Sequence, residues 1–350
     1  MDIEKRIIAF AALGKILRDS NAGSMSKILS AAMKPAAAHN AWFTNENILL
    51  SINSLGKMLD ERKLKNWIED YPHIKNQRPE VKNVGAIMAG NIPLVGFHDF
   101  LCILMSGNRF IGKLSSDDAY LLPAVAKTLI EIEPEFKELI HFIDKPFQKS
   151  AGISAYIATG SNNSARYFEY YFGKYPHIIR KSRNAVALLD GTESASDLKN
   201  LGKDIFQYFG MGCRNVSKIF IPLDYNLDHF FASIVDFGDI INHNKYANNY
   251  HYYRTIYLMN QEKFLDNNFL LVKESREIAS PVSTLYFERY NIQEELIKVM
   301  EEKKDRIQCI AGNILPHSSS PKCIPFGNTQ SPELQDYADG IDTMNFLLTL

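Results

Sequence analysis

Residues 84 to 172 alternate three times between a short apolar run and a helical stretch, and this alternation restricts the fold more than any other feature of the chain. Continuous apolar runs suit strands that are buried on both faces, as in a parallel sheet. Strand and helix in regular succession predict a doubly wound α/β fold. We expect strands at residues 84–89, 108–114 and 153–158, and helices at 94–105, 117–132 and 164–172.

Helical patterns precede this region, and a second α/β pattern follows it. Residues 4–70 are predicted to be largely helical, and a chain of 350 residues has room for about two domains. We place one domain at 1–182, a second at 183–315, and a return segment with a C-terminal strand at 316–350. In the second domain we expect strands at 185–189, 269–272, 282–287 and 307–310, and helices at 193–209, 227–237 and 292–303.

Charge and composition exclude several classes of partner. The formal net charge is −1 and no long basic stretch exists, so nucleic acid is not expected to bind. Apolar stretches reach only about ten residues, too few for a membrane span. The apolar residues 7–13 are flanked by charges and predict an amphipathic helix, with no signal peptide pattern. The four cysteines lack CxxC spacing, which favours reduced thiols in a cytoplasmic protein.

Cys213 is the candidate nucleophile. It lies in Gly-Met-Gly-Cys-Arg-Asn-Val-Ser, just before a β-rich run at 218–222. Gly210 and Gly212 leave the backbone free to bring a thiol close to a carbonyl. A structural cysteine is more often found inside an apolar run, as Cys102 is. These residues alone leave both roles open, because thiol reactivity depends on surroundings that the sequence does not show.

Two weaker motifs accompany Cys213, and each has a plain structural alternative. Thr159-Gly160-Ser161 follows a predicted strand and opens a helix, which suits either a bound pyrophosphate or an ordinary helix cap. Asn91 follows the first strand and precedes a proline, so it is either a carboxamide donor or a turn residue. The histidines show no HExxH motif or close pairs, and no metal site is expected.

Six segments, taken in order along the chain, resemble motifs of the aldehyde dehydrogenase superfamily. Six matches in the right order are more specific than any one of them. The branch that the chain resembles most is the acyl-CoA reductase family, which includes the fatty-acid reductase subunit of bacterial bioluminescence. The segments are Gly90–Pro93, Ser106–Ser115, Thr159–Ser161, the residues around Cys213, Glu277–Val282, and Pro325–Gly327 with Gly340 and Thr343.

This resemblance implies an aldehyde dehydrogenase-like fold, with a dinucleotide-binding domain at 1–182 and a catalytic domain at 183–315. It implies that Cys213 is the nucleophile and that the Asn91 side chain and the Cys213 N–H form an oxyanion hole. The cofactor residues that it implies are Lys113 at the adenosine ribose, Ser161 at the pyrophosphate and Glu277 at the nicotinamide ribose, with Ser115, Ser116 and Gly160 beside them.

Two departures from the superfamily pattern bear on the reaction. Hydrolytic members carry a general-base Glu where this chain has residues 177–182, which contain no carboxylate. Without that base, water is poorly activated, and this suits a thioester whose thiolate leaves easily. NAD-preferring members often carry a Glu three residues after the lysine, where this chain has Ser116. The resemblance therefore favours NADPH as cofactor, with NADH as the alternative.

We therefore expect NADPH-dependent reduction of an acyl-CoA to a fatty aldehyde through an acyl-enzyme on Cys213. Expected partners are an acyl-CoA or acyl-protein thioester, a second copy of the chain, and an acyl-transferring protein. Alternatives are an acyl-phosphate reductase, another aldehyde dehydrogenase-like oxidoreductase, and a non-catalytic acyl-binding subunit. Residues 142–152 are the candidate oligomerisation hairpin. The tyrosine-rich segments 242–246 and 250–253 line either an acyl path or a contact surface, and we favour the surface.

Overall fold

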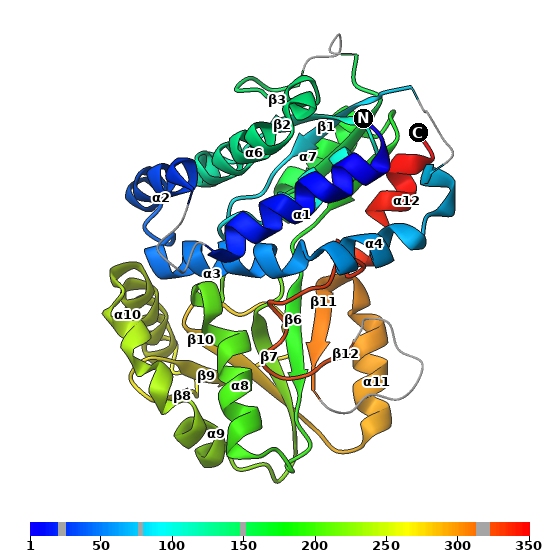
Figure 1. Ribbon diagram of the computed structural model, residues 1–350. Coiled ribbons are helices and arrows are strands. Elements are labelled where there is room, and N and C mark those ends of the chain that lie inside the picture. The colour runs from blue at the N-terminus through cyan, green and yellow to red at the C-terminus, as the bar shows by residue number, and fades with distance from the viewer. Residues whose placement is uncertain (20–25, 76–79, 148–151, 313–322) are drawn as a thin grey trace. The chain divides into compact units, whose positions relative to one another are not determined.

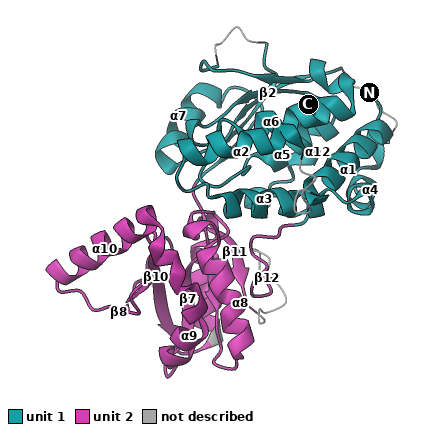
Figure 2. Ribbon diagram, turned by 60° about the vertical axis from the view of Figure 1, so that its left-hand side comes forward, with its two compact units in different colours: residues 1–181, 333–350 teal, residues 182–332 magenta. Residues whose placement is uncertain are grey.

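The computed structural model describes residues 1–19, 26–75, 80–147, 152–312 and 323–350. Within these ranges the chain forms two compact units (Figure 2). Unit 1 comprises residues 1–181 together with 333–350, and unit 2 comprises residues 182–332. The C-terminal residues therefore return to the unit that holds the N-terminus. The predicted α/β fold with parallel sheets is confirmed in both units.

The described part of unit 1 contains a parallel sheet with strand order β3-β2-β1-β4-β5. The order reverses between β1 and β4, the kind of position at which open α/β sheets bind ligands. The three strands predicted from the sequence are β1, β2 and β4, whereas the short edge strands β3 and β5 were not predicted. The strands are β1 (Asn83–Ile87), β2 (Arg109–Lys113), β3 (Ile140–Phe142), β4 (Ala155–Thr159) and β5 (His177–Arg180).

Helices cover both faces of this sheet (Figure 1). Val84 and Ala86 of β1 point into one core with the helices α1 to α6. Gly85 faces the other way, where a Cβ would come within 2.8 Å of the Tyr156 ring. Tyr156 stacks on Phe172 of α7 at 4.1 Å. The helices are α1 (Ile3–Asp19), α2 (Lys27–His39), α3 (Asn45–Met58), α4 (Glu61–Glu69), α5 (Phe97–Met105), α6 (Leu121–Ile132), α7 (Asn162–Phe172) and α12 (Thr343–Leu348).

Unit 2 is built on a second sheet, with strand order β12-β11-β6-β7-β10-β9-β8 in the described residues. Its pairs are parallel except β8 with β9. Helices α8 and α9 pack on one face and α11 on the other. The elements are β6 (Asn184–Leu188), α8 (Ala195–Phe206), β7 (Val216–Pro222), α9 (Leu227–Ser233), α10 (Asn244–Met259), β8 (Leu265–Asp266), β9 (Leu271–Glu274), β10 (Thr284–Tyr290), α11 (Gln293–Glu302), β11 (Ile307–Ala311) and β12 (Cys323–Ile324).

Helix α10 corrects the interpretation of the tyrosine-rich segments for two residues, Tyr246 and Tyr250, whereas Tyr252 is exposed. Tyr246 and Tyr250 are buried inside unit 2 and do not form a contact surface. Tyr246 donates to the Phe269 carbonyl oxygen at 3.0 Å, and Tyr250 to Asp266 at 2.6 Å. These two tyrosines are four residues apart, so they lie on the same face of α10, and this face packs inside unit 2. Helix α10 itself was not predicted from the sequence. The candidate hairpin at 142–152 falls partly on residues 148–151, outside the described ranges, and Phe142 itself ends β3.

Candidate functional site in unit 2 and cofactor edge of unit 1

Cys213 lies on a tight turn between helix α8 and strand β7. The Asn215 N–H donates to the Gly212 carbonyl oxygen at 3.0 Å, which places Cys213 and Arg214 at the centre of the turn. Cys213 is partly exposed, whereas Cys102 and Cys309 are buried. Burial raises the pKa of the Cys102 thiol well above its usual value. The turn therefore presents the Cys213 sulfur differently from the cysteines that lie inside α5 and β11.

The side chain of Asn215 fixes the shape of this turn. Its Oδ1 accepts from the Gly212 N–H at 2.7 Å, and its Nδ2 donates to the carbonyl oxygens of Asp204 and Gln207, both at 2.9 Å. A Cβ on Gly212 would lie 2.9 Å from Asn215 Oδ1, so a larger residue there would displace the asparagine. The buried Asn215 carboxamide thus links the end of α8 to Gly212, which precedes Cys213, and Asn215 itself follows Cys213 by two residues.

The backbone before the turn is left-handed at three consecutive residues. Tyr208, Phe209 and Gly210 have φ values of 52°, 59° and 76°. This conformation is unfavourable for residues with a Cβ, particularly bulky ones. It ends α8 at Phe206, earlier than the predicted helix 193–209. The Asn215 carboxamide bonds to Gln207 before these strained residues and to Gly212 after them. These hydrogen bonds stabilise the backbone conformation that leads to Cys213.

A segment from the end of unit 2 packs against the same turn. Asp204 of α8 is buried and accepts from the Gly327 N–H at 2.6 Å and from the Thr329 N–H and hydroxyl at 3.1 and 2.8 Å. Burial raises the Asp204 pKa, and these donors oppose that shift. The carboxamide of Gln330 then lies 3.5 Å from the position that a Gly212 Cβ would occupy.

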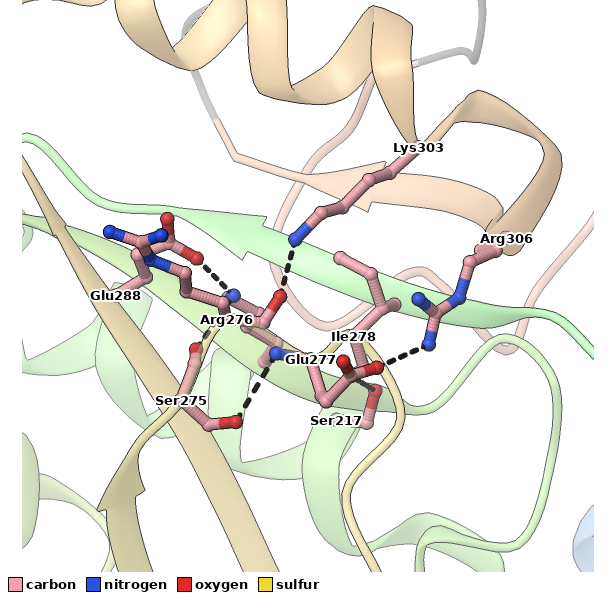
Figure 3. Close-up of polar contacts among 9 residues, drawn as sticks. Ser217, Ser275, Arg276, Glu277, Ile278, Glu288, Lys303 and Arg306 are labelled. Carbon is pink, nitrogen blue, oxygen red and sulfur yellow. Dashed lines mark hydrogen bonds and ion pairs between the residues drawn. The ribbon is translucent and has the colours of Figure 1, made fainter.

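Glu277 lies on the loop between β9 and β10, and the loop is held by its backbone (Figure 3). Ser217 donates to the Ile278 carbonyl oxygen at 2.7 Å, and Lys303 donates to that of Arg276. The Glu277 carboxylate is exposed and pairs with Arg306 at 2.7 Å. The hydrogen bond and charge of Arg306 lower the Glu277 pKa. The carboxylate is therefore ionised at neutral pH and available to hydroxyl donors.

Lys218 of β7 also holds the loop that carries Glu277, through a hydrogen bond to the backbone of that loop. Its side chain is fully buried, donates to the Ser275 carbonyl oxygen at 2.8 Å and pairs with Glu288. Burial lowers the Lys218 pKa, and the pairing with Glu288 opposes that shift. Together with Ser217 and Lys303, this lysine satisfies carbonyl oxygens along the loop, so the position of the Glu277 backbone is well determined.

In unit 1, Asn91, predicted as an oxyanion donor, and the predicted cofactor residues of this unit lie at the carboxyl edge of the sheet. Asn91 follows β1, Lys113 ends β2, and Gly160 and Ser161 follow β4. These three strands are adjacent and parallel, so their carboxyl ends lie at one edge. Ser161 caps α7 by accepting from the Ser164 N–H at 3.2 Å. A Cβ on Gly160 would approach Ser164 and Phe168 within about 3 Å, so the residue must be small.

The segments after β1 and β2 contact each other directly. A Cβ on Gly90 would lie 2.7 Å from the Ser115 side chain. Leu94 is left-handed, with φ of 59°, and its N–H donates to the buried Asp118 carboxylate at 2.7 Å. Lys113 donates to the Asp144 carbonyl oxygen at 3.1 Å, Ser115 caps the turn that follows, and Ser116 is exposed.

The segment without a carboxylate is edge strand β5, and its Arg180 is buried. Arg180 donates to both oxygens of Asp99 at 2.7 and 2.6 Å and to the Thr343 hydroxyl at 2.8 Å. Asp99 raises the Arg180 pKa against the opposing effect of burial. This arginine joins α5 to the C-terminal segment within unit 1.

The carboxyl edge of the unit 1 sheet includes the point between β1 and β4 where the strand order reverses. Gly160, which has no room for a Cβ, lies between β4 and the α7 N-terminus. Lys113 and the exposed Ser116 lie at and just after the end of β2, which β1 separates from β4. Among the described residues, no cluster of His, Cys, Asp and Glu is arranged to hold a metal ion. None of the described helices combines the length and apolar character needed to cross a bilayer.

Sequence reasoning missed Asp204, Asn215 and Gln330. Asn215 lies inside the motif around Cys213, and its type signals a turn, yet its partners are not visible in the sequence. Asp204 and Thr329 are 125 residues apart, and no local pattern joins them.

Solved structures with the same arrangement of elements define the fold class. An indole-3-acetaldehyde dehydrogenase from P. syringae, with NAD+ bound, has a TM-score of 0.62 and 12% identity, over 89% of this chain and 72% of that one. The NAD+ complex of an aldehyde dehydrogenase from Mycobacterium tuberculosis gives 0.61 and 14%, over 89% and 73%. A glyceraldehyde-3-phosphate dehydrogenase from Methanocaldococcus jannaschii, with NADP, gives 0.59 and 14%, over 89% and 76%. The chain has the aldehyde dehydrogenase fold.

The sequence narrows this class further. Residues 23–228 match the family model of the acyl-CoA reductase LuxC. The chain belongs to this acyl-CoA reductase family. No curated protein matches the sequence. The matched range includes Asn91, Lys113, Ser161 and Cys213, whereas Glu277 and Gln330 lie beyond it.

Proposed function

We propose that the protein reduces an acyl-CoA to the aldehyde with NADPH, through an acyl-enzyme on Cys213. The observation that supports this most is the turn that carries Cys213, where a partly exposed thiol is held by a buried asparagine within an acyl-CoA reductase family chain. Solved structures with this fold bind NAD+ or NADP, and the cofactor site that we propose for this chain is the carboxyl edge of unit 1.

The Cys213 thiolate would attack the thioester carbonyl carbon, forming a C–S bond while the carbonyl π electrons move to oxygen. The Cys213 N–H would stabilise this oxyanion, and the Asn91 carboxamide is the second proposed donor. The oxyanion then reforms the carbonyl, and the C–S bond to CoA breaks. CoA leaves as its thiolate, and the acyl group remains on Cys213.

Bound NADPH would supply a hydride to the carbonyl carbon of this acyl-enzyme. The resulting thiohemiacetal on Cys213 expels the cysteine sulfur as a thiolate, and the aldehyde leaves. One proton is taken up overall, and the products are the aldehyde, CoA and NADP+. Lys113, Ser115, Ser116, Gly160, Ser161 and Glu277 are the proposed cofactor residues.

Three features support reduction over hydrolysis and NADPH over NADH. Residues 177–182 contain no carboxylate, so water has no base there. Arg180 of this segment, in β5, is buried in an ion pair with Asp99 and is therefore not available as a base for water. Ser116 is exposed and uncharged beside Lys113, so it does not repel a 2′-phosphate.

The test is an assay of NADPH oxidation with acyl-CoAs of graded chain length. Wild type should release one CoA thiol for each NADPH oxidised, and Cys213→Ala should abolish both. Cys213→Ser keeps nearly the same side-chain volume. It is the matched control that separates loss of the thiol from loss of packing. Phosphate release from an acyl phosphate in place of thiol release would contradict the proposal. Turnover retained in Cys213→Ala would also contradict it. Ser116→Glu should shift the preference toward NADH.

A further inference from the structure

Gln330 carries a buried amide nitrogen beside the Cys213 turn. Its side chain is 9% exposed, and its Nε2 has no hydrogen-bond partner among the residues that the structure describes. Both atoms of the carboxamide head lie 3.5 Å from the position of a Cβ on Gly212. Gly212 and Cys213 share one peptide group, and the N–H of that group is the proposed oxyanion donor. Gln330 thus places a further donor, in addition to the proposed Asn91, near the Cys213 N–H and within the same unit.

The neighbours of Gln330 hold it in place without using its amide. Thr329 and Gly327 are bonded to the buried Asp204, so the backbone of this segment is fixed to α8. A buried donor without a partner destabilises a protein, and an apolar side chain of similar length would avoid the cost. Proteins retain a buried donor without a partner mainly at functional sites, where a bound ligand accepts the hydrogen bond.

We propose that Gln330 is a catalytic residue that donates a hydrogen bond from Nε2 to the oxygen of the acyl group on Cys213. This inference rests on the proposed function and adds a donor to it. The donor acts twice, because an oxyanion forms when the thiolate adds to the thioester and again when hydride adds to the acyl-enzyme. A donor aimed at developing negative charge accelerates both steps.

The experiment compares Gln330→Met and Gln330→Glu with wild type, and uses Ser331→Ala as the control in the same segment. Methionine keeps the length of the side chain and removes the donor. We expect kcat with acyl-CoA and NADPH to fall about 10²-fold, with little change in KM. The melting temperature should stay equal or rise, because an unpartnered buried donor has been removed. Ser331 is exposed, and its variant should match wild type in both measurements.

Gln330→Glu supplies an independent measurement. A buried carboxyl group has a raised pKa, and its protonated form donates a hydrogen bond as the amide does. The kcat ratio of Gln330→Glu to Gln330→Met should therefore rise as the pH falls from about 8 to about 6. A lower melting temperature or an unchanged kcat in Gln330→Met, or a kcat ratio that does not vary with pH, would overturn the inference. An inactive wild type would overturn the proposed function itself.

Discussion

Thr329 donates two hydrogen bonds to one carboxylate oxygen of Asp204, from its N–H at 3.1 Å and from its hydroxyl at 2.8 Å. The other oxygen accepts from the Gly327 N–H at 2.6 Å. Helix α8 thereby holds the segment after β12 beside the Cys213 turn. The helix contributes to the same turn through its last carbonyl oxygens, which accept from Asn215. A single buried carboxylate thus couples two parts of the site that are distant in sequence.

Replacing Asp204 with alanine should destabilise the protein by about 3 kcal/mol, because two buried donors of Thr329 and the part-buried Gly327 N–H lose a charged acceptor. The measurement is the free energy of unfolding from urea titration. Asp236→Ala is the matched control, because Asp236 is exposed and forms a surface ion pair with Lys199. A surface pair of that kind contributes less than about 1 kcal/mol. Equal losses in the two variants would show that the Asp204 network is not a stabilising feature.

Replacing Asn215 with alanine should slow acylation of Cys213 about 10²-fold. The turn loses the acceptor for the Gly212 N–H and the donor to α8, and a displacement of about 1 Å in a reacting group has an effect of this size. Single-turnover release of CoA thiol measures the step. Asn226→Ala is the control, because it removes only the cap of α9. That variant should lose about 1 kcal/mol of stability and keep its acylation rate. Unaltered acylation in Asn215→Ala would contradict the role of the turn.

Glu277→Gln should raise KM for NADPH about tenfold and leave the acylation rate unchanged. A charged acceptor for a ribose hydroxyl is weakened, while Ser217, Lys218 and Lys303 still hold the loop. Arg306→Gln removes the partner of Glu277 and should leave KM equal or lower, since the carboxylate then has no competing ion pair. The result that contradicts this assignment is an equal rise in KM for both variants.

Asp118 should make the stability of unit 1 depend on pH. Burial raises its pKa from 3.8 to about 6, so the folded state binds a proton more tightly than the unfolded state. The group therefore adds stability below pH of about 4, and this is lost as the pH rises through about 6. At about 1.4 kcal/mol per pKa unit the change is about 3 kcal/mol.

Urea unfolding of wild type and Asp118→Asn at four pH values from about 4 to about 7 tests this. The wild type should lose stability relative to the variant across that range, with most of the change between the two pKa values. A difference that stays constant with pH would show that Asp118 is not the titrating group.

Local sequence patterns predicted much of the fold. Strands β1 and β4 are short apolar runs buried on both faces, whereas β2 alternates between buried and partly exposed residues, and α5 to α7 follow them with helical periodicity. The edge strands β3 and β5 escaped prediction because they are short and only half buried. Helix α10 escaped because its tyrosines were assigned to a surface, whereas Tyr246, Tyr250 and Tyr257 pack inside unit 2.

The sequence by itself determined the alternation of strands and helices around β1, β2 and β4, the family and the candidate nucleophile Cys213, because these depend on local periodicity and on residue types at fixed spacing. Only the tertiary structure showed how Asp204, Asn215 and Gln330 surround the Cys213 turn. Parallel sheets join strands that are distant in the chain, so side chains as far apart as those of residues 204 and 329 meet only after the sheet and its helices have packed. Their hydrogen bonds depend on direction and burial, and neither is encoded in any short stretch of sequence.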